Sequence, residues 1–514
     1  MTDDTRKNRQ PKNLPFQMRL LGSSLLFLLQ FLLIFISLYT LSAKYFWIYA
    51  LLHLISAATV ISILNRRGNA GYKIAWVILM LVFPIFGITV YFLWGGNRAL
   101  PSRRKRMAEC ESHSFAGLLR DGRNLPALRR KNPLHARQAE YLMRESGTPL
   151  YRDTAVKFLP DGTVFFAHLL SELRQAKRYI FLEFFILAEG EMWREIETVL
   201  RQKSADGVEI RILFDDFGSS CRQRKKFLSR LTDAGIKVAV FNRIRPSADW
   251  FLNNRNHRKI VVIDGLVAFT GGINLGDEYI NRLRRFGVWA DCAVSLSGRA
   301  VECFCAMFCA MWEFTTHEQL NPSPYSASFP KADGFVLPYR DSPLNPQNPA
   351  EGIYLQMLNT AQSYVYIASP YLIIDDRMIA TLRMAVKSGV DVRILTPHIP
   401  DKRYVHPVTQ YNYLELLEAG VRIYEYTPGF LHAKYFVSDD SVATVGTVNM
   451  DSRSFRLHFE CGVWFSDCPA VLSVRNHFSA LLRESREISL AAWKKTPWFK
   501  RLGRAVLHLF SPFL

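Results

Sequence analysis

The hydrophobic residues of this chain are concentrated in three long runs near its start. The runs are Leu20–Ala43, Tyr45–Leu64 and Ile74–Trp94, and they contain no Asp, Glu, Lys or Arg. Each run is long enough to cross a hydrocarbon core of about 30 Å as an α-helix. A cleaved signal peptide fits less well, because the first run is too long and lacks a small-residue cleavage pattern. Residues 1–96 are therefore predicted to form a membrane anchor.

The third run contains Pro84 and Gly87, two residue types that interrupt helices. Basic residues before the first run and between the second and third runs fit the cytoplasmic side of a membrane. Three full crossings would place the cluster Arg103–Arg106, within a basic linker at residues 97–134, on the opposite side. We therefore hypothesise that the third run forms a re-entrant or shallow hairpin. The large domain of this multi-pass protein would then lie at the cytoplasmic face.

From about residue 135 the pattern changes to short apolar runs separated by amphipathic stretches. The short runs are rich in β-branched and aromatic residues and are bounded by Gly or Asp, which predicts buried strands. Helical stretches such as Gly162–Ala176 and Tyr411–Ala419 lie between them. This alternation predicts an α/β fold with a mixed sheet flanked by helices.

Four segments of the first half recur in the same order in the second half. Lys177–Gly190 corresponds to Gln362–Asp375, Gly207–Leu213 to Gly389–Leu395, Ala234–Val238 to Ala419–Ile423, and His257–Asn274 to His432–Asn449. Unrelated tandem domains would not give four ordered matches. The sequence therefore predicts two similar lobes, residues 135–318 and 353–492, packed about a pseudo-twofold axis. A proline-rich linker at residues 319–352 would join them.

The charge of the chain predicts its kind of partner. There are 65 Lys and Arg against 45 Asp and Glu, a formal charge of +20, which requires an anionic partner. Residues 1–110 hold 14 Lys and Arg but 3 acidic residues, so much of the excess lies beside the hydrophobic runs. The tail at 493–514 adds basic residues interleaved with apolar ones, and we predict an interfacial helix there rather than a solvated tail. An anionic membrane surface is thus favoured over nucleic acid.

The eight cysteines of the chain are too sparse for a disulfide scaffold. Cys303, Cys305 and Cys309 lie in an apolar helical stretch, and no His follows at a spacing typical of metal ligands. We expect these three thiols to pack in a core.

The last repeated segment carries the candidate chemistry. Each copy reads His-x-Lys, four residues, Asp, and then a small-residue turn that ends in Asn. The residues are His257, Lys259, Asp264 and Asn274 in the first lobe, and His432, Lys434, Asp439 and Asn449 in the second. His and Lys two positions apart project from the same face of a strand. The twofold relation brings both copies to one interface, where two imidazoles, two ammonium groups and two amides suit a phosphate.

Two imidazoles in one site suit a double displacement, in which one is the nucleophile and the other acts as general acid and then as base. A nucleophilic imidazole needs an acceptor on its second nitrogen to fix its tautomer. Asp291 and Glu460, downstream of the motifs in matching contexts, are the candidates; the alternative is an ordinary ion pair at a strand end. Asp264 and Asp439 are expected to support backbone turns or to hold the lysines.

The paired motif resembles that of the phospholipase D superfamily, and other segments resemble bacterial cardiolipin synthases. These segments are Ile74–Gly95, Gly271–Tyr279, Phe286–Asp291 and Asn449–Phe455. The resemblance implies phospholipase D-like lobes at a bacterial plasma membrane. It also implies a transphosphatidylation, in which two phosphatidylglycerol molecules give cardiolipin and glycerol through a phosphatidyl-histidine intermediate. The lysines with Asn274 and Asn449 would hold the non-bridging oxygens, and neither a metal ion nor a cofactor is implied. The run Leu20–Ala43 is additional to the pair expected of this family.

Three alternatives stay open at the level of sequence. A hydrolytic phospholipase D or a phosphatidylserine synthase shares the motif and differs only in the second nucleophile. A nuclease would place its basic residues around the cleft rather than beside hydrophobic runs. A non-catalytic membrane scaffold would carry degenerate motifs, whereas both motifs here are complete. The repeat makes the two histidines nearly interchangeable, with His257 preferred as the nucleophile, and it leaves the oligomeric state undetermined.

Overall fold

The structure is a computed structural model. It describes residues 43–65, 70–92, 101–118, 120–219, 224–244, 253–320, 332–345 and 347–511, together with Leu25, Leu28, Leu29, Leu32 and Leu33. Most of the first hydrophobic run therefore lies outside the described residues, as do residues 321–331 of the predicted linker.

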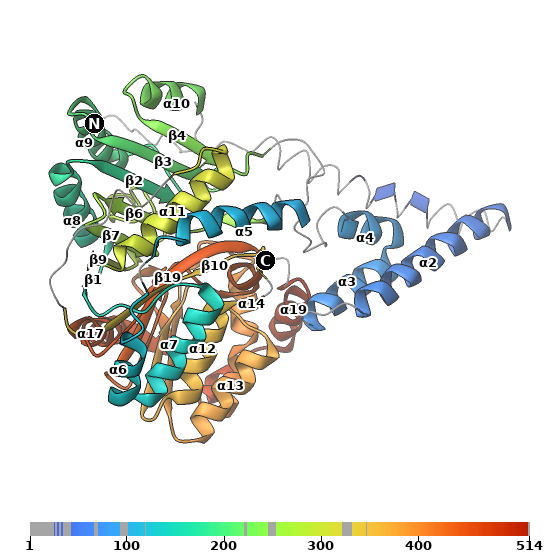
Figure 1. The fold of residues 1–514 in the computed structure, drawn as a ribbon. Helices are drawn as coiled ribbons and strands as arrows, with labels where there is room; N and C mark the ends of the chain where they lie inside the picture. The colour runs from blue at the N-terminus through green and yellow to red at the C-terminus, as the bar shows by residue number, and fades with distance from the viewer. Residues whose placement is uncertain are drawn as a thin grey trace, which may run out of the picture.

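The second hydrophobic run forms helix α2 (Ala43–Leu64), which projects away from the β-sheets of the molecule (Figure 1). Within the part of the chain that the structure describes, Phe46–Leu64 is the one helical segment long and apolar enough to cross a membrane. Large side chains along it, such as Trp47 and Leu54, are exposed. An exposed apolar helix of this length is typical of a segment that lies in lipid.

The third hydrophobic run is broken at Phe83. Helix α3 (Ala70–Val82) ends there, and α4 (Pro84–Val90) folds back, so that the backbone of Gly87 lies directly against Leu79 and Met80. Proline at the start of α4 suits this break, because it lacks the N–H that would continue the preceding helix. Helices of 13 and 7 residues are each too short to span about 30 Å at 1.5 Å per residue. This geometry supports the hairpin hypothesis for the third run, while the orientation of the anchor stays a prediction.

The predicted alternation of strands and helices is present in two lobes, each built on one sheet. The first sheet has the strand order β1-β9-β7-β6-β2-β3-β4. Its strands are β1 (Thr154–Leu159), β2 (Tyr179–Phe184), β3 (Glu209–Asp215), β4 (Lys237–Phe241), β6 (Ile260–Ile263), β7 (Val267–Gly271) and β9 (Ala293–Gly298). Its helices are α8 (Gly162–Gln175), α9 (Glu191–Ala205), α10 (Arg224–Thr232) and α11 (Val301–Thr316).

The second sheet repeats this order as β10-β19-β17-β16-β11-β13-β14 and adds β20 at its end. Its strands are β10 (Phe335–Asp341), β11 (Tyr364–Ala368), β13 (Asp391–Pro397), β14 (Arg422–Tyr426), β16 (Tyr435–Ser438), β17 (Val442–Gly446), β19 (His458–Ser466) and β20 (Ser485–Glu487). Its helices are α12 (Pro349–Thr360), α13 (Asp376–Lys387), α14 (His406–Tyr411), α15 (Tyr413–Ala419), α16 (Ser452–Arg456), α17 (Pro469–Arg483), α18 (Leu490–Lys494) and α19 (Trp498–His508). The two lobes therefore share one topology.

One hydrophobic core joins the lobes. It contains almost the whole of α11, including the buried thiols of Cys303, Cys305 and Cys309, together with side chains from both sheets. Helix α5 (Pro101–Phe115) lies beside α11 across the boundary between the sheets (Figure 1). Burying apolar surface from both lobes in one cluster stabilises their relative position.

The boundaries of the lobes differ from those expected at two places. Helices α6 (Asn124–Lys131) and α7 (Pro133–Ser146) precede the first sheet, but α7 packs against α12 and β10 of the second lobe. Strand β10, predicted to belong to the linker, is instead the edge strand of the second sheet. Its Pro338 is tolerated because an edge strand does not need every N–H for the ladder. Proline content alone suggested a linker where the chain in fact pairs with β19.

The motif aspartates hold the turns that follow β6 and β16. Asp264 accepts hydrogen bonds from the backbone N–H groups of Lys177, Arg178 and Tyr179 at 2.7–2.8 Å. Asp439 accepts the equivalent bonds from residues 362–364 at 2.8–2.9 Å. Both aspartates adopt positive φ angles, 53° and 54°, a conformation that Asp tolerates better than most residues. Each carboxylate thereby ties the end of the motif strand to the start of the neighbouring strand.

We predict that Asp264→Asn lowers the free energy of unfolding by about 1.5–3 kcal/mol, because an amide replaces a carboxylate that accepts three N–H groups. The catalytic rate per folded molecule should be unchanged, since the side chain serves the turn. Thermal unfolding of the purified protein measures the first quantity, and Asp439→Asn is the matched variant in the other lobe. A stable but inactive Asp264→Asn protein would assign this carboxylate to the chemistry instead.

Candidate active site

Each motif histidine is held by a strand that pairs with the other lobe. The short strand β5 (Arg255–Asn256) pairs in parallel with the start of β19, and the His257 N–H donates to the carbonyl of Phe459 at 2.9 Å. In the same way β15 (Gly429–Leu431) pairs with β8 (Val288–Ala290), and the His432 N–H donates to the carbonyl of Ala290 at 2.6 Å. The two motifs therefore meet at the interface between the lobes, as the repeat predicts.

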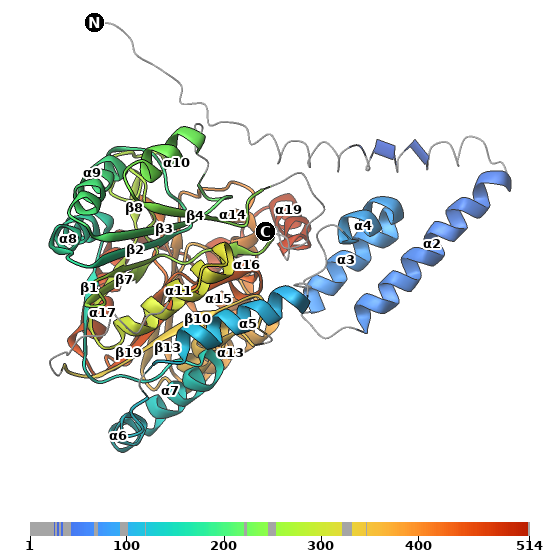
Figure 2. The same cartoon turned by 45° about the horizontal axis from the view of Figure 1, so that its top comes forward.

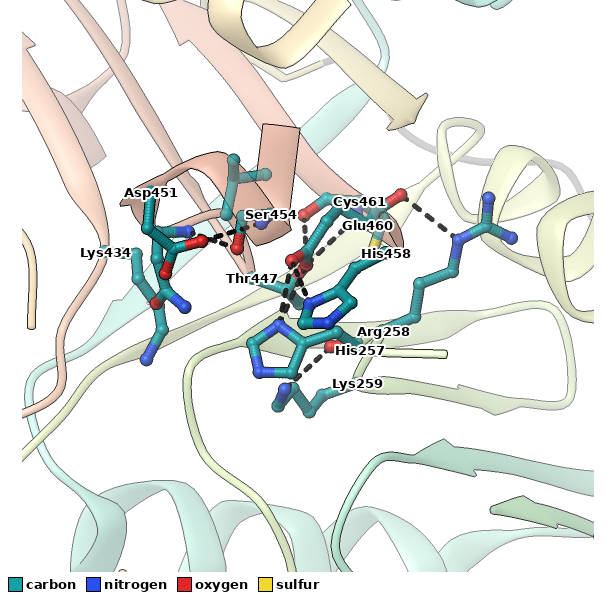
Figure 3. Close-up of polar contacts among 12 residues, drawn as sticks. His257, Arg258, Lys259, Lys434, Thr447, Asp451, Ser454, His458, Glu460 and Cys461 are labelled. Carbon is teal, nitrogen blue, oxygen red and sulfur yellow. Dashed lines mark hydrogen bonds and ion pairs between the residues drawn. The ribbon is translucent and has the colours of Figure 1, made fainter. Parts of the chain in front are cut away.

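The carboxylates that accept from the histidines come from the opposite lobe. The Nδ1 of His257 lies 2.9 and 3.0 Å from the two carboxylate oxygens of Glu460, a contact drawn in Figure 3. The Nδ1 of His432 lies 2.6 Å from Oδ2 of Asp291. Both carboxylates are fully buried. An ionised carboxylate only accepts, so each neutral imidazole carries its proton on Nδ1 and presents a bare Nε2.

Burial sets the protonation of the site. It lowers the pKa of His257 and His432 well below the usual value, and the charges of Lys259 and Lys434 lower it further. Burial also lowers the pKa of Lys259 to about 7 and that of Lys434 to about 8. The same desolvation raises the pKa of Asp291 to about 6. At neutral pH the free site thus holds two neutral imidazoles beside lysines that are poised to carry charge.

Each lysine also donates to the carbonyl of its own motif histidine. The distance from Lys259 Nζ to the carbonyl oxygen of His257 is 2.7 Å, and Lys434 makes the same contact to His432. These bonds keep the ammonium groups beside the histidine backbone, where an incoming phosphate would meet them. A buried ammonium that retains free N–H donors is suited to bind a phosphodiester oxygen.

The two motif asparagines, Asn274 and Asn449, differ in their hydrogen-bond partners. The Oδ1 of Asn274 accepts from the Ile186 N–H at 3.0 Å, and its Nδ2 donates to the Tyr279 hydroxyl at 2.7 Å. The Oδ1 of Asn449 is buried without a hydrogen-bond partner among the described residues. Asn274 therefore holds the surrounding loops, with one amide hydrogen left for a ligand, while the amide of Asn449 is less committed. Phosphate binding by either asparagine stays a prediction.

The small-residue turns leave room for the carboxylates. A side chain at Gly272 would overlap Asp291, with a Cβ only 2.0 Å from Oδ1. The equivalent residue in the second lobe is Thr447, whose hydroxyl donates to Glu460. The first lobe thus needs glycine beside its aspartate, whereas the second uses a threonine that adds a further donor to Glu460.

His458 is a feature of the site that the sequence analysis did not identify. Its ring lies 5.4 Å from that of His257, and its Nδ1 lies 3.8 Å from Oε1 of Glu460, beyond hydrogen-bond distance (Figure 3). Its counterpart in the other lobe is Trp289, whose ring lies 5.3 Å from that of His432. Comparing His458-Phe459-Glu460 with Trp289-Ala290-Asp291 in the repeat would have revealed this asymmetry.

One group of side chains in the described residues has the geometry of a metal site. The candidate ligand atoms of His257, His458 and Glu460 lie within 4.8 Å of one another. His257 and Glu460 already bond to each other, and Lys259 and Lys434 lie close enough to depress the pKa of His257. A dication would compete with these cations, so we interpret the group as the hydrogen-bonded pair of His257 and Glu460 with His458 beside it.

Comparison with known proteins shows the family to which the chain is similar. The family model described as "Cardiolipin synthase, PLD-like domain" matches residues 169–288 and 354–482, and the model described as "Phospholipase_D-nuclease N-terminal" matches residues 46–96. An uncharacterized protein of Streptococcus mutans is 39% identical over 89% of this chain and 99% of its own length. The cardiolipin synthases of Alkalihalophilus pseudofirmus and Halalkalibacterium halodurans are each 33% identical, over 86% and 88% of this chain and 88% and 91% of their own lengths.

Among solved structures, the phosphatidylserine synthase of Haemophilus influenzae has the same fold. The TM-score is 0.55 at 12% identity, over 73% of this chain and 98% of that protein. The two sheets and the paired motifs define an enzyme of the phospholipase D-like class, which transfers phosphodiester-linked groups. This chain belongs to the cardiolipin synthase family of that class, whose members are phosphatidyltransferases that act on phospholipids at membranes.

We predict that Glu460→Gln lowers kcat by about 10²–10⁴-fold, the usual contribution of a correctly held acid–base group. An amide at this position cannot fix the Nδ1–H tautomer of His257 as an ionised carboxylate does. Steady-state kinetics on phospholipid substrate measures the loss. The matched control is Asp341→Asn. This buried carboxyl lies opposite Glu460 on β10 but accepts from the backbone N–H groups of Ser342 and Ala350. Burial raises its pKa to about 8, and the amide mimics its neutral form. Equal losses in both variants would contradict the positioning role.

We also predict that kcat/KM falls as pH rises through about 7 to 8, the pKa values of Lys259 and Lys434. Deprotonation removes the positive charge that attracts the phosphodiester. The fall in kcat should come at higher pH, because a bound anion raises the pKa of both lysines. A pH–rate profile of both parameters measures this separation, and a kcat/KM that stays flat to pH 10.5 would contradict it.

We predict that the free energy of unfolding of the ligand-free protein rises with pH, whereas kcat/KM falls. The pKa of both lysines is lower in the folded chain than the ordinary 10.5, so the unfolded state binds more protons between these values. Stability contributed by these groups therefore increases as pH rises from about 7 towards 10.5. Replacing Lys259 with Met should remove part of this dependence in thermal unfolding.

Proposed function

We propose that this protein is a cardiolipin synthase that transfers a phosphatidyl group from one phosphatidylglycerol to the terminal hydroxyl of another. The products are cardiolipin and glycerol. The observation that carries the proposal is the reciprocal pairing of His257 with Glu460 and of His432 with Asp291 across the lobe interface. Two imidazoles held with bare Nε2 atoms are what a two-step displacement at phosphorus requires. Membership of the cardiolipin synthase family selects the lipid substrate.

In the first step the Nε2 of His257 attacks the phosphorus of the first phosphatidylglycerol. The bond between phosphorus and the glycerol headgroup oxygen breaks. His432 is neutral in the free site and takes up a proton on Nε2 when the anionic phosphodiester binds, because the added negative charge raises its pKa. It delivers this proton to the departing oxygen. Free glycerol leaves, and the phosphatidyl group stays bonded to His257. Asp291 stabilises the imidazolium form of His432 while that proton is present.

In the second step His432, now neutral, removes the proton from the terminal hydroxyl of the second phosphatidylglycerol. The resulting oxygen attacks phosphorus, and the bond from phosphorus to His257 breaks. Cardiolipin is released with His257 restored and His432 protonated again. Exclusion of water favours the lipid hydroxyl over hydrolysis, and His257 and His432 are only 6% and 8% exposed.

The charge that develops on the phosphate is met by Lys259 and Lys434, with Asn274 and Asn449 as further donors. Both lysines are buried, and electrostatic stabilisation is stronger in such an environment than in water. Two protonated lysines supply the positive charge that a divalent cation provides in other phosphoryl-transfer sites. The motif residues therefore account for nucleophile, acid, base and phosphate binding.

The substrate is embedded in a membrane, and the anchor fits this requirement. Helix α2 is long and apolar enough to cross a bilayer, and α3 and α4 form a short hairpin beside it (Figure 2). The positions of the basic residues in the sequence favour a location of the lobes at the cytoplasmic face of the plasma membrane, against anionic lipid.

The test is a product assay on the purified full-length protein in phosphatidylglycerol vesicles, with lipids resolved by mass spectrometry and glycerol quantified. Equal amounts of cardiolipin and glycerol are expected. Phosphatidic acid with glycerol and no cardiolipin would show that water is the acceptor, as in a phospholipase D. His257→Ala and His432→Ala proteins should form neither product, because each step uses both imidazoles. Substantial turnover by either variant would contradict the shared site.

A further inference from the structure

Helix α19 (Trp498–His508) is attached to the second lobe through its basic side. The guanidinium of Arg504 donates to Oε1 of Gln410 at 3.0 Å and lies 4.2 Å above the ring of Trp493. The His508 ring stacks on Tyr411 with centroids 4.0 Å apart. These contacts hold α19 against α14.

The opposite side of α19 is apolar and exposed. Trp498 and Phe499 are 74% and 58% exposed, and Leu502 and Val506 are exposed on the same side. Leu509 and Phe510, in the turn that directly follows the helix, are exposed as well. At 3.6 residues per turn these positions form one continuous stripe. A helix on a water-soluble protein buries its apolar side and exposes its charged side, and α19 has the reverse arrangement. We call the stripe formed by these six residues the apolar face of α19.

A patch of this kind marks a contact with another apolar body. The charges around the face identify that body as anionic lipid. Lys495, Lys500 and Arg501 are exposed around α19, and no acidic residue follows Glu487 in the sequence. A second copy of the same chain would bring further positive charge to the contact, whereas an anionic bilayer supplies both apolar depth and negative headgroups.

The position of α19 in the fold agrees with a bilayer. In both views α19 lies on the side of the lobes that faces α3 and α4 of the membrane anchor (Figures 1 and 2). A bilayer that holds the anchor would therefore be close to the apolar face as well.

The surface of the second lobe that α19 contacts also lies next to the active site. Leu507 and Tyr371 both pack against a small hydrophobic cluster of Ile373, Val405 and Val408. The Tyr371 hydroxyl donates to Asp401 at 2.8 Å and accepts from Lys402 at 3.0 Å. Lys402 is close enough to both motif histidines for its charge to lower their pKa. We call Tyr371, Asp401 and Lys402 the rim of the active site. This rim lies between α19 and the two motif histidines.

We propose that α19 lies in the interface of an anionic bilayer, with its apolar face among the acyl chains, and thereby holds the rim of the active site at the level of the lipid headgroups. The helix acts as a second, peripheral attachment beside α2 and orients the lobes on the surface. The effect of α19 on catalysis rests on the proposed lipid substrate. The attachment of α19 to the bilayer does not.

The attachment is tested with a nitrobenzoxadiazole fluorophore on the full-length protein, in nanodiscs of phosphatidylglycerol that each hold one protein. The labelled sites are Leu502→Cys on the apolar face and Leu472→Cys, an exposed apolar position on α17. Dithionite, which bleaches the fluorophore from water, should act about tenfold more slowly at 502 than at 472. Equal rates would overturn the proposal. Protection at 502 that appears only in vesicles, where copies can meet, would identify a second copy as the occupant and would also overturn it.

The effect of α19 on catalysis is tested with a double variant, Leu502→Glu combined with Val506→Glu. Neither side chain is buried against the lobe, so the fold should be preserved. The matched control is Val164→Glu with Leu472→Glu, two exposed apolar positions on α8 and α17. Cardiolipin formation in phosphatidylglycerol vesicles should fall about tenfold in the α19 variant, because a misplaced rim no longer meets its substrate. The control should be unaffected, and both variants should match the wild type in detergent–lipid micelles.

A full rate for the α19 variant in vesicles would overturn the orienting role. A loss of equal size in micelles would do so too, since it would reflect damage to the enzyme. If the wild-type protein made no cardiolipin in either system, the proposed function would fail. The dithionite experiment would still decide the attachment of α19.

Discussion

The exchange of buried carboxylates between the lobes is the constraint on which the rest of the structure depends. Glu460 of the second lobe accepts a hydrogen bond from His257 of the first lobe, and Asp291 of the first lobe accepts one from His432 of the second. Removing one partner of such a pair leaves a buried charge uncompensated, which costs several kcal/mol. The lobes therefore cannot separate or shift without stranding these groups. Correct packing of the lobes and assembly of the catalytic pairs are the same event.

Burying the charged groups of the site costs free energy, and this cost affects how the site binds substrate. Burial lowers the pKa of Lys259 and Lys434 by disfavouring their charged forms. In the proposed mechanism an arriving phosphodiester favours the charged form of both lysines, so substrate binding and protonation of the lysines are coupled. The large core around α11, shared by both lobes, offsets the cost of holding these groups away from water.

The two halves of the site are similar but not equivalent. Thr447 stands where the first lobe has Gly272, and His458 stands where it has Trp289. Glu460 therefore has three polar neighbours, while His432 lies among the aromatic rings of Trp289, Tyr279 and Phe430. A double displacement needs one nucleophile and one acid–base group, and these differences give the histidines distinct surroundings for distinct tasks.

The sequence by itself determined the two lobes, and it predicts the membrane anchor and the motif residues of the site, because internal repetition and apolar run length are properties of the chain order. The order β1-β9-β7-β6-β2-β3-β4 recurs in the second sheet as the repeat predicts. Only the tertiary structure decided which carboxylate serves which histidine, that β10 is an edge strand and not a linker, and that α19 faces outward with its apolar side. Each of these depends on contacts between residues far apart in the chain, such as His257 and Glu460. A local pattern carries no information about which distant partner completes such a contact.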